Sequence, residues 1–282
     1  MDLEAIKAKL AAMANQGSSK PRDLWKPKDK HVIRLLPYTH GPEPFIELGF
    51  HYDIGSTKSL LCPKFNSGDE CAVCDFADKL RSWKGEDGQD KPEVERKADF
   101  EIFKKIQVKP RYYVAMIERD IDGGNVPKFW AFGKSIYETL LTMCADEEKN
   151  DAVDVKGAGV LTDTKKAFDL KIDFKKANNE DKKGNKKNFP ITECENKLSP
   201  TPLAKTQKEI DEIISKIKNM NDVYPQTTSA DVKKALLSFI NSGGAEPEVG
   251  DVQKDEYKPN TAEHPVVGGQ SLDEAFGALE SD

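Results

Sequence analysis

Apolar and polar residues alternate along several short stretches of the chain, which is the pattern of half-buried β-strands. The clearest stretch is 168–174, where apolar side chains at every second position are separated by Asp169, Lys171 and Asp173. Similar patterns rich in β-branched and aromatic residues predict further strands at 31–36, 45–50, 105–118, 126–132 and around Val160. An Asp-Gly-Gly-Asn turn at 122–125 separates two of these strands and predicts a hairpin.

Other stretches place apolar residues three or four positions apart, which predicts amphipathic helices. These helices are expected at 1–16, at 76–83, from Ser135 onward, at 210–220 and from Thr228 to Ile240. Glu138 follows Ser135 at the spacing of a capping box, and Gly243 and Gly244 are expected to end the last helix. The charged stretch 85–98 is predicted to be a loop. The lysine-rich stretch 175–188 is predicted to be either a solvated loop or a phosphate clamp.

Short strands separated by turns, followed by helices, predict an α+β fold. A small β-barrel of the oligonucleotide-binding (OB) type fits this pattern, and a β-sandwich fits the strands equally well. We expect three parts: an N-terminal self-association arm at 1–20, a core at 21–244, and an acidic, largely disordered tail at 245–282. A tail segment that folds on a partner protein is predicted from Leu272, Phe276 and Leu279.

Four possible metal ligands lie close together in the sequence. His51 is followed by Cys62, Cys71 and Cys74, and the last two form a Cys-x-x-Cys pair. Thiolates and imidazole are the ligands of tetrahedral Zn²⁺. Four protein ligands would fill the coordination sphere and leave no position for a catalytic water. The spacing therefore predicts one structural Zn²⁺ in a subdomain inserted into the core.

Two alternatives concern this motif. A Cys-x-x-Cys pair can also be a redox pair, but no strand–turn–helix pattern of the thioredoxin type surrounds this one. His31 and His40 lie close enough upstream to replace His51 as the fourth ligand. The two remaining cysteines, Cys144 and Cys194, are interpreted as ordinary free thiols.

The formal net charge of −6 is unevenly distributed. Residues 246–282 contain ten acidic residues and two lysines, so the rest of the chain is slightly basic. A basic body favours polyanionic partners, and an acidic tail can compete with them or recruit other proteins. No apolar stretch is long enough to span a membrane, and no signal peptide opens the chain. Together with an odd number of cysteines, this predicts a cytoplasmic protein that is not secreted.

Aromatic and cationic residues are interleaved between positions 103 and 134. Bases stack on aromatic rings while Lys and Arg contact phosphates, so this mixture favours single-stranded nucleic acid as a ligand. The candidate contacts are Phe103, Lys105, Lys109, Arg111, Tyr112, Tyr113, Lys128, Trp130 and Lys134. Tyr112 and Tyr113 would point to opposite faces of a strand, so some of these rings are expected in the core. The sequence has no phosphate-binding Gly-rich loop, nucleophile elbow or deaminase motif, and we predict no enzymatic activity.

Several motifs of the chain occur in one particular order. They are Leu24-Trp-Lys26, His31-Val-Ile-Arg-Leu-Leu-Pro37, Pro44-Phe45, Gly49-Phe-His51, Cys62, Cys71-Ala-Val-Cys74, Tyr112-Tyr113, Lys128-Phe-Trp-Ala-Phe-Gly-Lys134 and Phe168-Asp-Leu-Lys171. In this order they resemble the single-stranded-DNA-binding, helix-destabilising proteins of T-even-type bacteriophages. The resemblance covers most of residues 20–175, and the motif of one His and three Cys is its most specific part.

The resemblance implies a protein that coats single-stranded DNA, without sequence preference, during phage DNA replication, recombination and repair. It implies an arm for cooperative self-association along DNA and a tail that docks replication and recombination proteins. The implied zinc ligands are His51, Cys62, Cys71 and Cys74. The aromatic residues of the family's DNA groove correspond to Phe103, Tyr112, Tyr113 and Trp130. The alternative hypothesis is a zinc-stabilised protein-interaction scaffold of the replication machinery.

Overall fold

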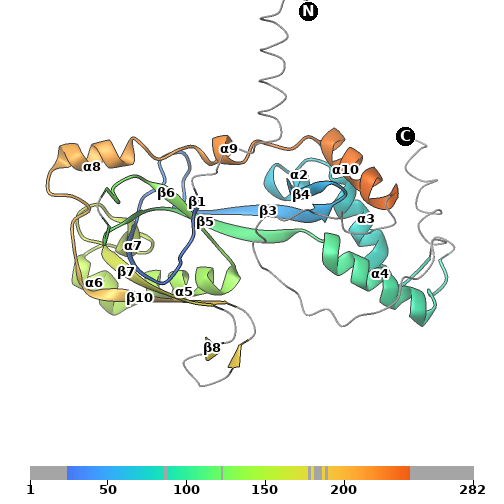
Figure 1. Ribbon diagram of the computed structural model, residues 1–282, viewed down its shortest axis with the longest axis horizontal. Coiled ribbons are helices and arrows are strands. Elements are labelled where there is room, and N and C mark those ends of the chain that lie inside the picture. The colour runs from blue at the N-terminus through green and yellow to red at the C-terminus, as the bar shows by residue number, and fades with distance from the viewer. Residues whose placement is uncertain are drawn as a thin grey trace, which may run out of the picture. The chain divides into compact units, whose positions relative to one another are not determined.

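The computed structural model describes residues 24–85, 88–121, 123–176 and 190–241, together with the backbone of 179–180 and 186–187 (Figure 1). The predicted arm and the predicted acidic tail lie outside these residues. The chain divides into two compact units. Within the described residues, the first unit comprises 24–46, Tyr113–Lys175 and Thr192–Val223, and the second comprises Glu47–Tyr112, part of 176–191, and 224–241.

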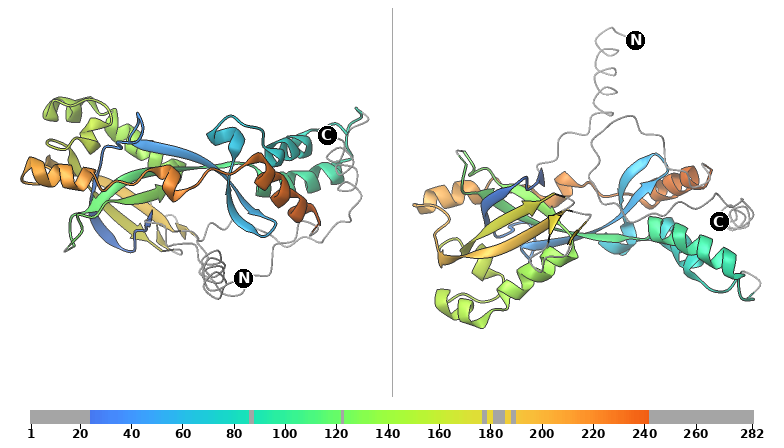
Figure 2. Two further views of the ribbon diagram at one scale, coloured as in Figure 1. Left: turned by 90° about the horizontal axis from the view of Figure 1, so that it is seen from above. Right: turned by 60° about the horizontal axis from the view of Figure 1, so that its bottom comes forward.

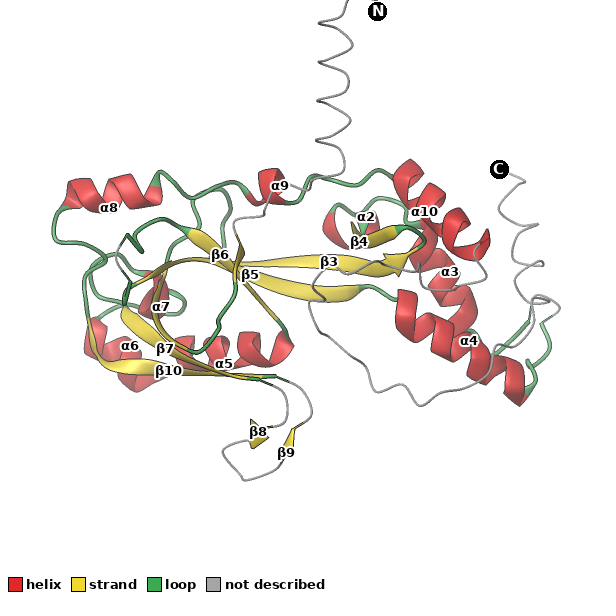
Figure 3. Cartoon of the chain, in the orientation of Figure 1, coloured by secondary structure: helices red, strands yellow, loops and turns green. Residues whose placement is uncertain are grey.

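Eight strands form one large sheet (Figure 3). Six of them follow the order β1 (Leu24–Trp25), β6 (Lys128–Phe132), β5 (Lys109–Glu118), β2 (Lys30–Leu35), β7 (Phe168–Lys175) and β10 (Ile191–Pro200). The other two, β3 (Phe45–Ile54) and β4 (Thr57–Leu61), form a hairpin, and β3 also pairs with β5. β2 is antiparallel to both of its neighbours, so that Ile33 lies opposite Glu118 on β5 and Leu170 on β7.

The paired strands β2 and β7 both direct apolar side chains into one core. Ile33 on β2 and Leu170 on β7 are fully buried in the core of the first unit. Asp169 departs from the pattern, because it is buried as well and accepts a hydrogen bond from Arg34 Nε at 2.8 Å. A charged residue in an alternating strand can therefore be buried when an opposite charge is buried with it.

The mixture of helices and strands confirms the coarse prediction of fold class. Closure of a sheet into a barrel requires pairing between its two end strands. Among the described residues, β1 and β10 end the path and do not pair with each other, so the sheet is open and the predicted OB barrel is not confirmed. β10 was not expected from the sequence, because its residues alternate only weakly between apolar and polar.

The first unit contains helices α5 to α9 of the described chain. They are α5 (Lys134–Cys144), α6 (Glu147–Val153), α7 (Gly159–Thr162), α8 (Gln207–Ile214) and α9 (Met220–Val223). The predicted helix after Ser135 is confirmed. Its predicted capping box is wrong, because Gly133 is the N-cap and no side chain caps this helix. None of the helices formed by described residues is long and apolar enough to cross a membrane.

Two further predictions in the first unit are corrected. Val160 lies in the short buried helix α7, not in a strand. The single helix predicted at 210–220 ends at Ile214, where the chain tightens into i→i+3 bonds from Lys216 N–H to Ile213 C=O and from Ile217 N–H to Ile214 C=O. These tighter turns still bury Ile217, so apolar spacing alone could not reveal the break.

The second unit combines the β3–β4 hairpin with four helices. These are α2 (Pro63–Asn66), α3 (Ala72–Arg81), α4 (Glu93–Ile106) and α10 (Ser229–Asn241). The predicted loop at 85–98 is therefore wrong from Glu93 onward, because Asp99 and Ile106 bury one face of α4. β8 (Asn179–Glu180) and β9 (Lys186–Lys187) are strands of two residues each, and they pair as a hairpin within the predicted lysine-rich loop. The helix predicted from Thr228 is confirmed as α10, and Gly243 and Gly244 lie outside the described residues.

Candidate metal centre

Four side chains with metal-binding chemistry converge in the second unit. His51 lies on β3, Cys62 is the N-cap of α2, Cys71 is the N-cap of α3, and Cys74 lies in the first turn of α3. Their donor atoms all lie within 4.8 Å of one another, and only Cys74 is not fully buried. The structure thus brings together the four residues that the sequence predicted, as a cluster that could hold one metal ion.

The size of the cluster fits a tetrahedral ion. His51 Nε2 lies 3.3 Å from Cys71 Sγ and 3.6 Å from Cys74 Sγ, and the sulfur atoms of Cys62 and Cys74 are 3.4 Å apart. Tetrahedral Zn²⁺ with ordinary bond lengths would place two sulfurs about 3.8 Å apart and a sulfur and a nitrogen about 3.5 Å apart. A donor set of three sulfurs and one nitrogen is also one that Zn²⁺ prefers. The residues present therefore fit a closed, structural site for this metal.

A backbone carbonyl orients the imidazole of His51. His51 Nδ1 lies 2.7 Å from the carbonyl oxygen of Ile106, the last residue of α4. A carbonyl can only accept a hydrogen bond, so Nδ1 must carry a proton, and in the neutral imidazole that a metal requires Nε2 keeps its lone pair toward the cysteines. Metal-ligating histidines are commonly fixed by such a partner.

The side chain of Asn66 fastens the first cysteine to β3. Its amide nitrogen donates to the carbonyl oxygens of Gly49 at 2.9 Å and Cys62 at 2.8 Å, and its oxygen accepts from Gly49 N–H at 3.0 Å. The Cys62 N–H also donates to the Gly49 carbonyl. A side chain at Gly49 would collide with the ring of Phe65, so the close approach of this ring to β3 requires glycine at position 49.

The four groups also shift one another's protonation. Hydrogen bonds with Cys62 and Cys74 lower the pKa of the Cys71 thiol. Burial disfavours the charged imidazolium of His51, but hydrogen bonds with Cys62 and Cys71 outweigh it and raise the pKa to about 9. Metal ligands must be deprotonated, so binding of an ion would release protons and would weaken as the pH falls.

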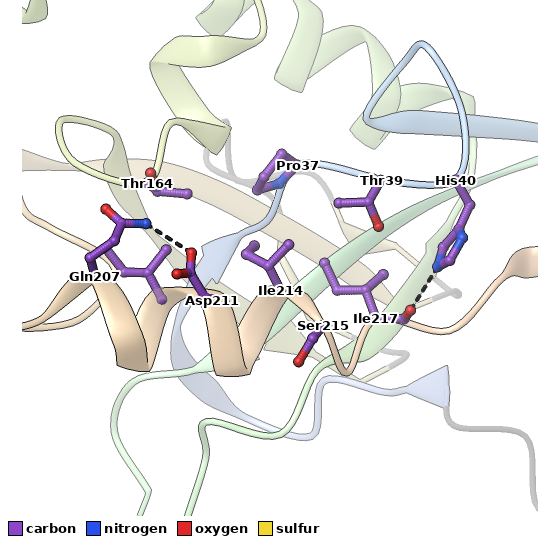
Figure 4. A pocket seen from close by; sticks show the side chains of 10 residues that line it. Pro37, Thr39, His40, Thr164, Gln207, Asp211, Ile214, Ser215 and Ile217 are labelled. Carbon is purple, nitrogen blue, oxygen red and sulfur yellow. Dashed lines mark hydrogen bonds between the residues drawn. The ribbon is translucent and has the colours of Figure 1, made fainter.

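The two competing histidines are engaged elsewhere, in the first unit. His31 Nε2 accepts a hydrogen bond from Lys28 N–H at 3.3 Å. His40 lines an open cavity of about 480 Å³ beside α8, where its Nε2 lies 2.9 Å from the Ile217 carbonyl oxygen (Figure 4). His51, and neither of these two, is therefore the histidine that lies beside the three cysteines.

Cys144 and Cys194, which the sequence analysis interpreted as ordinary thiols, have no metal-binding neighbours in the described clusters. Burial raises the pKa of the Cys144 thiol to about 11 and that of Cys194 to about 12. Such thiols carry little thiolate near neutral pH and react slowly.

A second feature of this unit, not predicted as a group from the sequence, is a face of exposed and half-buried rings and cations. We call it the ring–cation face, and its residues are Arg81, Trp83, Arg96, Phe100, Phe103 and Lys104. Trp83 is 72% exposed and Phe100 is 50% exposed. Each ring has a cation over it: Arg96 over Trp83 at 5.1 Å, Lys104 over Phe100 at 5.3 Å, and Arg81 over Phe103 at 5.9 Å.

The nine predicted nucleic-acid contacts divide between the two units. Phe103, Lys105, Lys109, Arg111 and Tyr112 belong to the second unit, and Tyr113, Lys128, Trp130 and Lys134 belong to the first. Lys105 and Lys134 are exposed, whereas Phe103, Lys109, Arg111 and Lys128 are half-buried.

Three of the predicted rings are buried in the core. Tyr112, Tyr113 and Trp130 are 7%, 2% and 1% exposed. Stacking on a base requires an open ring face, which these side chains do not present in the described structure. Contact of these three rings with nucleic acid stays a prediction, and it would require a local rearrangement. Trp83 and Phe100 are already exposed and would need none.

A scan against models of known protein families finds no match to this chain, and a search of curated proteins finds no significant relative.

Proposed function

We propose that the protein binds single-stranded DNA without sequence preference, and that one structural Zn²⁺ held by His51, Cys62, Cys71 and Cys74 stabilises the second unit. The motif order that resembles the phage helix-destabilising proteins supports this proposal. The observation that carries it is the ring–cation face, because exposed rings interleaved with cations are the chemistry that holds single strands. Coating of DNA in replication, recombination and repair belongs to the same proposal.

The geometry of α4 suits this role. Arg96, Phe100, Phe103 and Lys104 are spaced so that they share one side of the helix. Phe100 and Phe103 stack with their ring centroids 5.9 Å apart. The adjoining side of α4 is held by an ion pair between the buried Asp99 and Lys91 at 2.6 Å. A firmly placed helix can thus offer ring faces and cations without first having to become ordered.

The expected energetics follow from stacking and counterion release. Each stacked base contributes roughly 1–3 kcal/mol, and the affinity should fall with salt with a log–log slope of about −0.7 per neutralised phosphate. Preferential binding to single strands would destabilise duplex DNA by mass action, without ATP.

The second candidate function is a protein-interaction scaffold. The same ring–cation face favours it, because Trp, Phe and Arg are enriched where proteins contact one another. The two candidates differ in one outcome, since a scaffold would show no saturable binding of oligo(dT).

The test is a salt-dependent titration of the full-length protein with oligo(dT), followed by tryptophan fluorescence and by anisotropy of labelled DNA. We expect Phe100→Ala and Trp83→Ala each to weaken binding about 5–150-fold, which corresponds to one stacked base. Arg96→Ala should also lower the salt slope by about 0.7. The matched control is Lys97→Ala, which removes a neighbouring exposed cation of α4 that pairs with Glu93 at 2.7 Å. Binding that none of the ring variants changes, or equal affinity for duplex DNA, would refute the proposal.

A further inference from the structure

Helix α10 packs into the core that contains the metal centre, although it lies far from the four ligand residues in the sequence. Its buried residues are Val232, Ala235, Leu236, Phe239 and Ile240. They share one hydrophobic cluster with Cys62 and Cys71, and with residues of α3 and α4. α10 contacts α3, the helix that begins at Cys71 (Figure 2). The apolar surroundings of two ligand residues are thus partly supplied by the last described helix.

Residues at the start of α10 and just before it also hold the loop between Cys62 and Cys71. Ser229 Oγ donates a hydrogen bond to the carbonyl oxygen of Glu70 at 2.8 Å, directly before Cys71. Ser67 Oγ donates to Gln226 Oε1 at 3.1 Å, so a second bond fastens the same loop. Both contacts join residues 159 positions apart in the chain.

A third contact brings α10 against the β3–β4 turn. Gly55 has a φ of +58°, and a Cβ there would lie 2.9 Å from both the Ala235 carbonyl oxygen and the Ser238 side chain. The turn that follows the strand of His51 is therefore shaped to the surface of α10. Cys62, Cys71 and His51 each belong to a segment that this one helix contacts.

We propose that α10 is a positioning element of the metal centre, so that docking of α10 and binding of the metal stabilise each other although α10 provides no ligand. A cluster of thiols binds a cation more tightly when the segments that carry them are held in place beforehand, and the contacts of α10 reduce the conformations open to these segments. Two events that stabilise the same state must be coupled reciprocally and by the same free energy.

The first test measures metal retention in full-length variants loaded with Zn²⁺. Leu236→Ala removes buried contacts with the cluster, and Ser229→Ala removes the hydrogen bond to Glu70. The control is Lys234→Ala, an exposed residue of the same helix. Zinc transfer to a chromogenic chelator is followed over time, and the thiolate absorption of the Co²⁺-substituted protein reports whether all ligands remain bound.

We expect Leu236→Ala to weaken metal binding about tenfold or more, Ser229→Ala to weaken it several-fold, and Lys234→Ala to leave it unchanged, since loss of groups that support metal ligands typically costs about 10–100-fold. Equal zinc release from Leu236→Ala and Lys234→Ala would overturn the proposal. Neither measurement involves DNA, so failure of the proposal on α10 can be distinguished from failure of the proposed DNA-binding function.

The second test runs in the opposite direction on the unaltered protein. Amide hydrogen exchange is measured with Zn²⁺ bound and after its removal by a chelator. We expect protection to be lost in α10 together with α3, while α8 in the first unit keeps its protection and provides the internal reference. An α10 that stays protected after α3 has lost protection would show that its docking is independent of the metal, and the proposal would fail.

Discussion

Among the described residues, each unit of the protein contains a buried polar cluster, and these two clusters are satisfied in different ways. In the first unit, Arg34 is fully buried, and its guanidinium donates to Asp169 at 2.8 Å and to the Thr201 carbonyl oxygen at 2.7 Å. Arg119 donates to the same carboxylate at 3.2 Å and to the Leu203 carbonyl oxygen. The hydrogen bonds of this cluster are therefore made by protein atoms alone.

The cluster of the second unit could hold one metal ion. Its three thiols and one imidazole lie against one another, and the thiolates of a metal-loaded site would depend on the bound cation for the balance of their charge. The first unit should therefore be stable over a wide range of conditions, whereas the stability of the second should depend on metal and pH.

The largest expected effect is that of metal removal. Chelation should unfold the second unit and spare the first, because binding of structural Zn²⁺ contributes about 10–16 kcal/mol in small zinc domains. Hydrogen exchange of the loaded and chelated protein should show loss of protection in β3, α3 and α4 and retention in β2 and β7. Cys71→Ser should have the same effect, and Cys144→Ser, a buried thiol of the first unit, is the control. If chelation left the exchange of both units unchanged, the comparison would be wrong.

The next effect concerns the ion pair of the first unit. Asp169→Ala should lower the free energy of unfolding by about 3–5 kcal/mol, because it leaves the buried charge of Arg34 without its carboxylate. Burial already lowers the pKa of Arg34, and Asp169 opposes that shift. Denaturant unfolding of Asp169→Ala and of the control Asp173→Ala, on the same strand, measures the difference. The zinc content should stay at one per chain in both variants, and its loss from Asp169→Ala would contradict the independence of the two clusters.

A smaller effect is expected for the side chain that fastens Cys62. Asn66→Ala should cost about 1–3 kcal/mol, because the carbonyl and N–H groups of Gly49 lose their amide partner. The loss should appear in the second unit, with weaker zinc binding in a chelator competition. Asn221→Ala, an exposed asparagine of the first unit, is the control. Zinc binding equal to that of the control would mean that Asn66 does not position the cysteine.

The smallest effect compares two helix caps. Thr206 Oγ1 accepts from Glu209 N–H in α8, and Thr228 Oγ1 accepts from Asp231 N–H in α10. Either Thr→Ala change should cost about 1 kcal/mol. Thermal unfolding with and without Zn²⁺ should show that the ion offsets the loss only for Thr228→Ala. If Zn²⁺ offset the loss of stability of Thr206→Ala equally, the two units would not differ in their dependence on the metal.

The candidate metal site could be predicted from the sequence because its chemistry is local. Cys and His are rare in this chain, and their spacing between His51 and Cys74 limits the possible partners. The carbonyl of Ile106 could not be predicted, since every residue has one and only the fold brings it to His51. The same holds for α10, whose apolar spacing indicates a helix but not what that helix covers.

The fold was predicted best where one periodic signal dominates. β7 was found because its apolar residues alternate, β2 and β6 because β-branched, leucine and aromatic residues are concentrated there, and α10 because apolar residues recur at helical spacing. Helix α4 was missed because its charged residues suggested a loop, although Asp99, Ile102 and Ile106 follow the spacing of one helix face. One ring of the pair Tyr112 and Tyr113 was expected at a surface, but β5 is buried without interruption from Tyr112 to Glu118, as in a strand covered on both faces.

The dependence of the metal centre on α10 also has a consequence for the order of synthesis. A chain that grows from its N-terminus presents its three cysteines and His51 long before Ser229, which lies 159 residues after its partner Glu70. At the usual rates of translation this interval is on the order of ten seconds. During that time the thiols would lack the helix that covers them, so the nascent chain is at its most vulnerable to oxidation or to capture of a wrong metal before its C-terminal part has been made.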